Sequence, residues 1–159
     1  MLLAVLTISD RCSQGLLEDT AGPAAVVLLK QHFPGAEIVT ALLADDEIAI
    51  AEKLREFCAA GASLALTVGG TGMSPRDRTP EATRRVIDRE APGLAEAIRA
   101  KGAESNPYAY LSRGIAGMRE KTLIVNLPGS RRGASESLAA IVALLRHGIE
   151  VAGGGQQHP

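Results

Sequence analysis

The segment GGTGMSPRDR, residues 69–78, combines a run of glycines with closely spaced charged side chains. Consecutive glycines allow backbone N–H groups to approach an anion closely, because no Cβ atom stands in the way. Asp77 lies between Arg76 and Arg78, so its carboxylate could hold Mg²⁺ while the arginines contact phosphate oxygens. The alternative is a tight turn in which Asp77 pairs with a neighbouring arginine. The spacing matches neither G-x-G-x-x-G nor the P-loop, which indicates phosphate chemistry of another kind.

Two further polar segments and an acidic pair are candidates for the same site. The segments are SDRCSQG at residues 9–15 and NLPGSRRGAS at residues 126–135, and each follows a predicted strand. Asp45 and Asp46 precede a predicted helix, where an acidic pair usually serves as a cap. Cys12 has no histidine near it in the sequence, which argues against a Cys–His nucleophile. The three loops together favour an anion site, although none does so alone.

These loops need a scaffold that brings them to one edge. Short apolar runs predict strands, and apolar residues three and four positions apart predict helices between them. This alternation predicts a single doubly wound α/β domain over residues 1–150, with three layers, a mostly parallel sheet and helices on both faces. Ligands bind such domains at the carboxyl ends of the strands, where the loops lie. The predicted strands are residues 2–8, 37–43, 64–68 and 122–126.

Local signals set the predicted ends of the helices. Thr79 followed by Pro80 predicts an N-cap and a first helical position, with the helix continuing to about Arg89 and its positive dipole end facing the glycine loop. Glycines and a proline interrupt residues 92–117, which predicts short helices or turns there. Residues 151–159 are expected to form a flexible tail.

Composition excludes several classes of function. The chain has 17 basic and 18 acidic residues and a net charge of −1, so no overall field attracts nucleic acid or an anionic membrane. Two cysteines are too few for a disulfide framework, and neither has metal-ligand spacing. The apolar start of the chain lacks the basic residues of a signal peptide. We therefore expect a cytoplasmic protein without membrane or nucleic-acid partners.

Five segments occur in order across residues 4–150: TISDR (7–11), EDTAGP (18–23), TVGGTGMSPRDRTPEAT (67–83), LSRGIAG (111–117) and NLPGS (126–130). Together they resemble the molybdopterin adenylyltransferase family of molybdenum cofactor biosynthesis, which includes the MogA and MoaB proteins and related domains of gephyrin and of a plant homologue. The resemblance implies an enzyme that adenylylates molybdopterin with Mg-ATP and releases pyrophosphate. It also implies a homotrimer and a molybdenum insertase as a partner.

The resemblance also implies roles for individual residues. Asp46 and Asp77 would be the catalytic acids and would hold Mg²⁺, Asp46 because DDEIAI resembles the family's Pro-Asp-Glu segment. The residues that would bind ATP or molybdopterin are Ser9, Asp10, Gly69, Gly70, Thr71, Gly72, Ser74, Asn126, Pro128, Gly129 and Ser130.

The sequence departs from the family pattern at two positions. Asp45 stands where the family commonly has Pro, and Arg78 stands where a small β-branched residue is usual. Arg78 could alter the electrostatics beside Asp77. Two alternatives therefore stay open: a molybdopterin-binding module without adenylylation, and a nucleotide or phospho-sugar hydrolase on the same fold.

Overall fold

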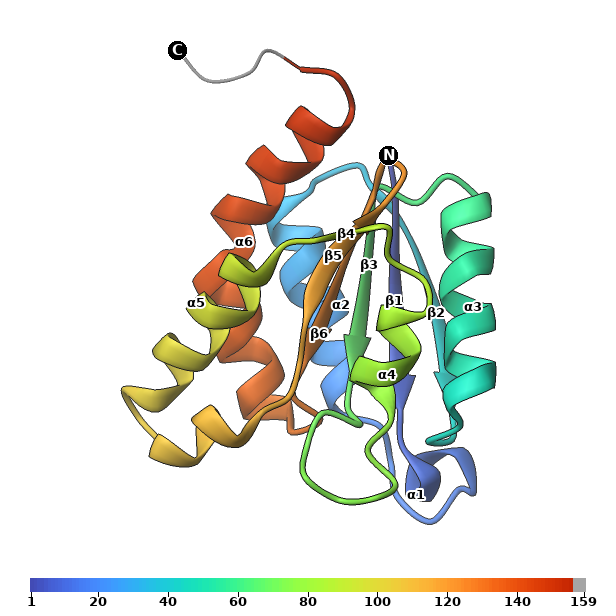
Figure 1. Ribbon diagram of the computed structural model, residues 1–159, viewed down its shortest axis with the longest axis vertical. Helices are drawn as coiled ribbons and strands as arrows, with labels where there is room; N and C mark the ends of the chain where they lie inside the picture. The colour runs from blue at the N-terminus through green and yellow to red at the C-terminus, as the bar shows by residue number, and fades with distance from the viewer. Residues whose placement is uncertain (156–159) are drawn as a thin grey trace.

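A six-stranded sheet forms the centre of the molecule (Figure 1). The computed structural model describes residues 1–155, and its strands pair in the order β2-β1-β3-β6-β5-β4. The first four strands in this order are parallel, whereas β5 pairs with β6, and β4 with β5, in antiparallel fashion. The mostly parallel α/β sheet predicted from the sequence is thus confirmed. The strands are β1 Leu2–Ile8, β2 Glu37–Leu43, β3 Leu64–Val68, β4 Arg89–Glu90, β5 Ala116–Arg119 and β6 Thr122–Leu127.

Helices cover both faces of this sheet, which gives the three predicted layers (Figure 1). Side chains of β1 alternate between two cores: Leu3 and Val5 pack with α2, α5 and α6, whereas Ala4 and Leu6 pack with α3 and α4. Because both faces are covered, the central strands β1, β3 and β6 are buried along nearly their whole length and are mostly apolar, whereas the edge strand β2 has exposed positions. The helices are α1 Asp10–Ser13, α2 Ala21–His32, α3 Glu47–Ala59, α4 Thr79–Arg84, α5 Pro92–Ala103, the 3₁₀ helix η1 Pro107–Leu111 and α6 Arg131–Ala152.

The helix after the glycine loop is shorter than predicted. It ends at Arg84, and Arg89 belongs to β4. Arg78 occupies its N-cap position without a side-chain cap, so the prediction that Thr79 caps the helix is wrong. Thr79 is fully buried, and its Oγ1 donates a hydrogen bond to the carbonyl oxygen of Gly69 (2.9 Å). The hydroxyl therefore stabilises the glycine loop and not the helix end.

The last helix reaches into the segment that was expected to form a flexible tail. Val151 and Ala152 are helical, so α6 continues two residues into the expected tail, and residues 156–159 lie outside the described residues. Within residues 1–155, none of the helices combines the length and the apolar character needed to cross a bilayer.

Candidate active site

Two glycines bring the loop after β3 against the ends of β1 and β6. Gly69 and Gly70 have φ angles of 111° and 64°, in the region that favours glycine. A Cβ atom added to Gly69 would lie 2.2 Å from the carbonyl oxygen of Ile8. One added to Gly129 would lie 3.1 Å from Cα of Gly69. The three loops therefore converge on one rim, as the sequence predicted, and they meet through bare backbone.

The glycine loop leaves several backbone N–H groups without protein partners. The N–H of Gly69 donates to the carbonyl oxygen of Leu127 (3.1 Å). Across residues 1–155, however, the N–H groups of Gly70, Thr71 and Gly72 find no protein acceptor. Successive N–H groups in a turn are well suited to an anion. The loop can therefore offer three donors to a phosphate group.

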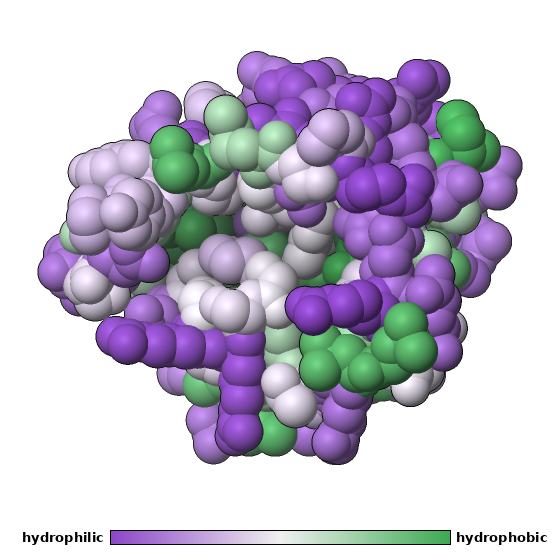
Figure 2. All heavy atoms as spheres, turned by 90° about the horizontal axis from the view of Figure 1, so that it is seen from below, coloured by the Kyte–Doolittle hydropathy of each residue, from purple (hydrophilic) through white to green (hydrophobic). Residues whose placement is uncertain are grey.

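Two pockets flank the loop at this end of the molecule. Each has a volume of about 510–520 Å³, within the range of small-molecule sites. Figure 2 shows this end face on: weakly polar residues surround a hollowed centre, with strongly hydrophilic side chains and separate hydrophobic patches around it. We define the carboxylate pocket by Ser9, Arg11, Glu18, Asp19, Asp45, Gly69, Gly70, Asp77, Gly129, Ser130 and Arg131. We define the apolar pocket by Thr71, Gly72, Met73, Ile98, Tyr108, Leu111, Ser112, Pro128 and Ser130.

The start of α6 lies between the two pockets. Ser130 lines both and caps this 22-residue helix, its Oγ accepting a hydrogen bond from the N–H of Gly133 (3.1 Å). The N-terminus of a long helix attracts anions through its dipole and its unpaired N–H groups. The sequence placed this dipole at Thr79, but α4 has only six residues. In the structure, the N-terminus of the much longer helix α6 lies at the site instead.

Asp10 and Asp45 hold each other's loops together. The N–H of Asp45 donates to Oδ1 of Asp10, and the N–H of Asp10 donates to Oδ2 of Asp45, both at 3.0 Å. Arg76 contacts both carboxylate oxygens of Asp10, at 2.8 and 2.9 Å. The hydrogen bonds from Arg76, followed by the one from Asp45, lower the pKa of Asp10. The chain thus links the ends of β1, β2 and β3 by polar contacts.

Asp45 lines the same pocket as Asp77, together with Glu18 and Asp19. Burial is the main cause that raises the pKa of Asp45, and the nearby charges of Asp10 and Asp77 raise it further against the hydrogen bond from Asp10. Asp77 itself accepts a hydrogen bond from the N–H of Ser74 at Oδ2 (2.9 Å). Asp46 is exposed and caps α3, accepting from the N–H of Ala49 (2.8 Å). The structure therefore brings Asp77 together with Asp45 and leaves Asp46 outside the pocket.

We expect Asp45→Asn to raise the melting temperature at pH 7 by about 1–3 °C, a small gain because solvent screens part of the repulsion. Asn keeps the acceptor for the N–H of Asp10 but has no charge. The pKa of Asp45 in the folded state lies above the ordinary value of 3.8. The ionised carboxylate therefore lowers the free energy of unfolding at pH 7, whereas the neutral carboxyl at low pH does not. The gain should therefore vanish below about pH 4.

Thermal melts from pH 3 to pH 8 measure this effect, and Asp46→Asn is the matched control. Asn caps a helix about as well as Asp, so that variant should melt within about 1 °C of the parent. A lower melting temperature for Asp45→Asn at pH 7 would contradict the prediction.

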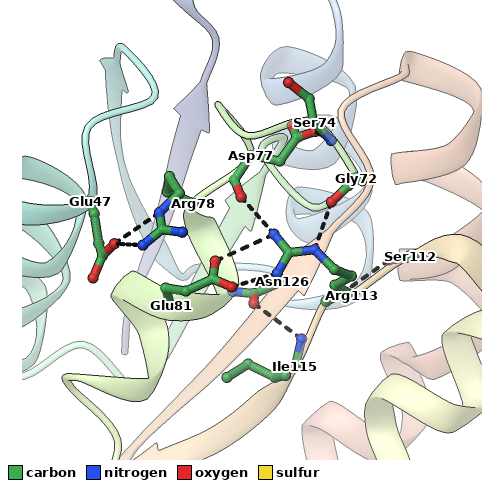
Figure 3. Close-up of polar contacts among 11 residues, drawn as sticks. Glu47, Gly72, Ser74, Asp77, Arg78, Glu81, Ser112, Arg113, Ile115 and Asn126 are labelled. Atoms are coloured by element: carbon green, nitrogen blue, oxygen red, sulfur yellow. Dashed lines mark hydrogen bonds and ion pairs between the residues drawn. The ribbon is translucent and has the colours of Figure 1, made fainter.

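Arg78 does not lie over the site, although the sequence suggested that it could alter the charge beside Asp77. Its guanidinium contacts Glu47 at the start of α3, with Nε at 2.9 Å from Oε2 (Figure 3). Arg85 contacts the other oxygen of Glu47, and the hydrogen bonds from Arg85 and then Arg78 lower the pKa of Glu47. The family departure at Arg78 is therefore accommodated by an ion-pair network that joins α3 and α4.

Asn126 is directed into the interior. Its Nδ2 donates to the hydroxyls of Thr67 and Thr83, both at 2.9 Å, and its Oδ1 accepts from the N–H of Ile115 (3.1 Å). Its buried amide is used by the protein itself and lines neither pocket. Asn126 therefore fixes the segment before β5 to β6.

Arg113 is the main residue at this rim that sequence reasoning missed. Its side chain is only 33% exposed and contacts the glycine loop (Figure 3). The only sequence signal was its place in LSRGIAG, one of the five family segments.

The predicted ligand-binding residues fall into four groups. Ser9, Gly69, Gly70 and Gly129 line the carboxylate pocket, Thr71, Gly72 and Pro128 line the apolar pocket, and Ser130 lines both. Asp10, Ser74 and Asn126 line neither pocket but fix the loops that do.

The chain is similar to known proteins over most of its length. Residues 4–147 match the family model described as "Probable molybdopterin binding domain". The chain is 36% identical to molybdopterin adenylyltransferase of Helicobacter pylori strain 26695 over 151 residues, covering 94% of this chain and 86% of that protein. It is 43% identical to the molybdopterin biosynthesis enzyme MoaB from Thermus thermophilus, with a TM-score of 0.87 and 99% of both chains covered.

Other relatives are much longer than this chain. The molybdenum cofactor synthesis protein cinnamon of Drosophila melanogaster is 39% identical over 150 residues, which cover 94% of this chain. The chain spans 25% of the length of cinnamon and 22% of that of gephyrin from Dictyostelium discoideum. It therefore matches one portion of these longer proteins.

Proposed function

The chain belongs to the molybdopterin-binding domain family of molybdenum cofactor biosynthesis, and on this premise we propose that it transfers AMP from ATP to the terminal phosphate of molybdopterin. A phosphate oxygen of the pterin attacks the α-phosphorus of ATP, the bond to the β-phosphate breaks, and pyrophosphate leaves. The attacking oxygen is already ionised, so no strong base is needed. Alignment and charge stabilisation then account for catalysis.

One observation supports this function most strongly: two ligand-sized pockets meet at Ser130. Transfer between two substrates requires their reacting phosphates to lie next to each other. The start of α6 and the N–H groups of Gly70, Thr71 and Gly72 offer donors on both sides of this junction. Arg11 and Arg131, both exposed, line the carboxylate pocket and can contact the phosphates of ATP.

The acidic residues fit a magnesium ion that is completed by phosphate oxygens. Among residues 1–155, no three His, Cys, Asp or Glu side chains are grouped so that they could hold a metal by themselves. Mg²⁺ commonly binds through one or two carboxylates together with substrate phosphates. Asp77 would provide one carboxylate, and Asp45 or Asp46 the second: pocket geometry favours Asp45, and the family pattern favours Asp46. The ion would neutralise charge on the phosphates of ATP.

The function is tested by mixing the protein with Mg-ATP, with and without molybdopterin. Pyrophosphate that appears only with molybdopterin is the expected result. Pyrophosphate or phosphate without the pterin would indicate a hydrolase. Binding of molybdopterin without either product would indicate a non-catalytic binding module.

We also propose a cytoplasmic homotrimer that transfers its product to a molybdenum insertase. The exposed apolar side chains of Val27 on α2 and Leu42 on the edge strand β2 support self-association. Light scattering at micromolar concentration should give about three times the chain mass of 16.5 kDa. A mass near 16.5 kDa would contradict the trimer.

A further inference from the structure

We infer that Arg113 is a positioning residue that sets the conformation of the Asp77 loop, an inference that rests on the proposed function for its catalytic consequence. Three parts of one guanidinium contact the loop and the helix after it. Nε donates to the carbonyl oxygen of Gly72 (2.8 Å), Nη2 to that of Asp77 (2.6 Å), and Nη1 to Oε1 of Glu81 (2.5 Å). Arg113 thus spans both ends of the segment between Gly72 and Asp77 (Figure 3).

The backbone of Arg113 contacts the same loop. Its N–H donates to the carbonyl oxygen of Thr71 (2.9 Å). The only other hydrogen bonds and ion pairs of residues 72–77, among the described residues, are those of the turn between Ser74 and Asp77 and the pair of Arg76 with Asp10. Arg76 is 65% exposed in that pair, so solvent screens it. The half-buried Arg113 is therefore the stronger constraint.

The rest of the fold holds Arg113 in place. Arg99 of α5 donates to the carbonyl oxygens of Ser112 (3.3 Å) and Gly114 (2.9 Å), on either side of Arg113. Asn126 accepts from the N–H of Ile115 two residues later. These contacts fix the main chain, so the guanidinium reaches the loop from a defined position.

Glu81 completes the arrangement. It lies in the first turn of α4, and the hydrogen bond from Arg113 is the main cause that lowers the pKa of its carboxyl. The ionised pair fixes the plane of the guanidinium, so its remaining N–H groups are directed at the two carbonyl oxygens. Lysine has a single nitrogen and cannot reproduce this planar set of donors.

Hydrogen exchange at Ser74, Asp77 and Thr79 tests the inference without any enzyme assay. In Arg113→Lys these amides should exchange at least about tenfold faster, because loop opening no longer breaks the same hydrogen bonds. Arg119→Lys is the matched control: Arg119 is also half-buried and donates to a backbone carbonyl, that of Val86 (3.0 Å), at the far end of β5. It should leave exchange of the loop unchanged.

Turnover then tests whether Arg113 acts through Asp77. Arg113→Lys should lower pyrophosphate release about tenfold in the parent protein and less than about twofold in an Asp77→Asn background. Equal losses in both backgrounds, or unchanged loop exchange, would overturn the inference.

If Arg113→Lys does not fold, Glu81→Gln should give a smaller increase in exchange at the same amides, and no increase would overturn the inference. If the parent releases no pyrophosphate, the proposed function fails, while loop exchange still decides the role of Arg113.

Discussion

Asp77→Asn is expected to lower pyrophosphate release by about 10² or more, which corresponds to roughly 3 kcal/mol of transition-state stabilisation. Asn has the same shape and can still accept the hydrogen bond from the N–H of Ser74, so the loop should keep its conformation. What it lacks is the negative charge beside Gly70 and Asp45 that would hold Mg²⁺. The loss should therefore appear in rate and not in folding.

Three measurements on this variant separate the two roles of Asp77. Turnover should fall, the affinity for molybdopterin should change much less, and the melting temperature should stay close to that of the parent. Asp45→Asn and Asp46→Asn in the same assay identify the second acid, because only the metal-holding residue should cause a comparable loss. A variant at Asp77 that melts earlier yet turns over at the parent rate would show that Asp77 is a structural residue.

Gly70→Ala is expected to cost about 2–3 kcal/mol of stability more than Gly35→Ala and to abolish measurable ligand binding in the carboxylate pocket. Both glycines have positive φ, 64° and 81°, so the backbone cost of alanine is similar at both positions. Only at Gly70 does the new Cβ collide, 2.3 Å from Oγ1 of Thr79 and 2.9 Å from Oδ1 of Asp45. At Gly35 nothing lies within 4 Å.

Denaturant unfolding of the two variants measures the difference in stability, and titration with Mg-ATP measures binding. The collision should displace Thr79, which donates to the carbonyl oxygen of Gly69, and so disturb the loop that offers N–H groups to phosphate. Equal stabilities together with an unchanged dissociation constant would mean that the glycine loop is only a turn.

The central strands could be predicted from the sequence because their signals are local. Residues 2–8, 37–43 and 64–68 are apolar runs bounded by polar or glycine-containing turns, and the structure has β1, β2 and β3 at these positions. Strands β4 and β5 were missed. β4 has two exposed residues, and neither strand has a periodic pattern long enough to distinguish it from a turn.

The site could be predicted only in part, because several of its residues are determined by contacts across the fold. The convergence of the glycine loop with the loops after β1 and β6 followed from the rule for parallel sheets. The roles of the Thr79 hydroxyl and the Arg113 guanidinium could not be predicted in this way. Their hydrogen-bond partners lie 10 and about 40 positions away in the sequence, so only the folded chain brings them together. Asp45 and Asp46 are adjacent carboxylates that the sequence does not distinguish. The path of the chain after β2 directs Asp45 to the pocket and Asp46 to the N-cap of α3.

The contact between Gly69 and Gly129 limits how this scaffold can acquire new ligands. Both residues are bare backbone at the floor of the carboxylate pocket. A side chain on Gly69 would collide with the carbonyl oxygen of Ile8, and one on Gly129 would press against Cα of Gly69. Variation that changes ligand preference must therefore arise in the walls, where Leu17, Tyr108 and Leu111 are exposed. A library randomised at both floor and wall positions should return glycine at the floor after selection for folding and diverse residues in the walls, so the chain divides into a fixed floor and evolvable walls.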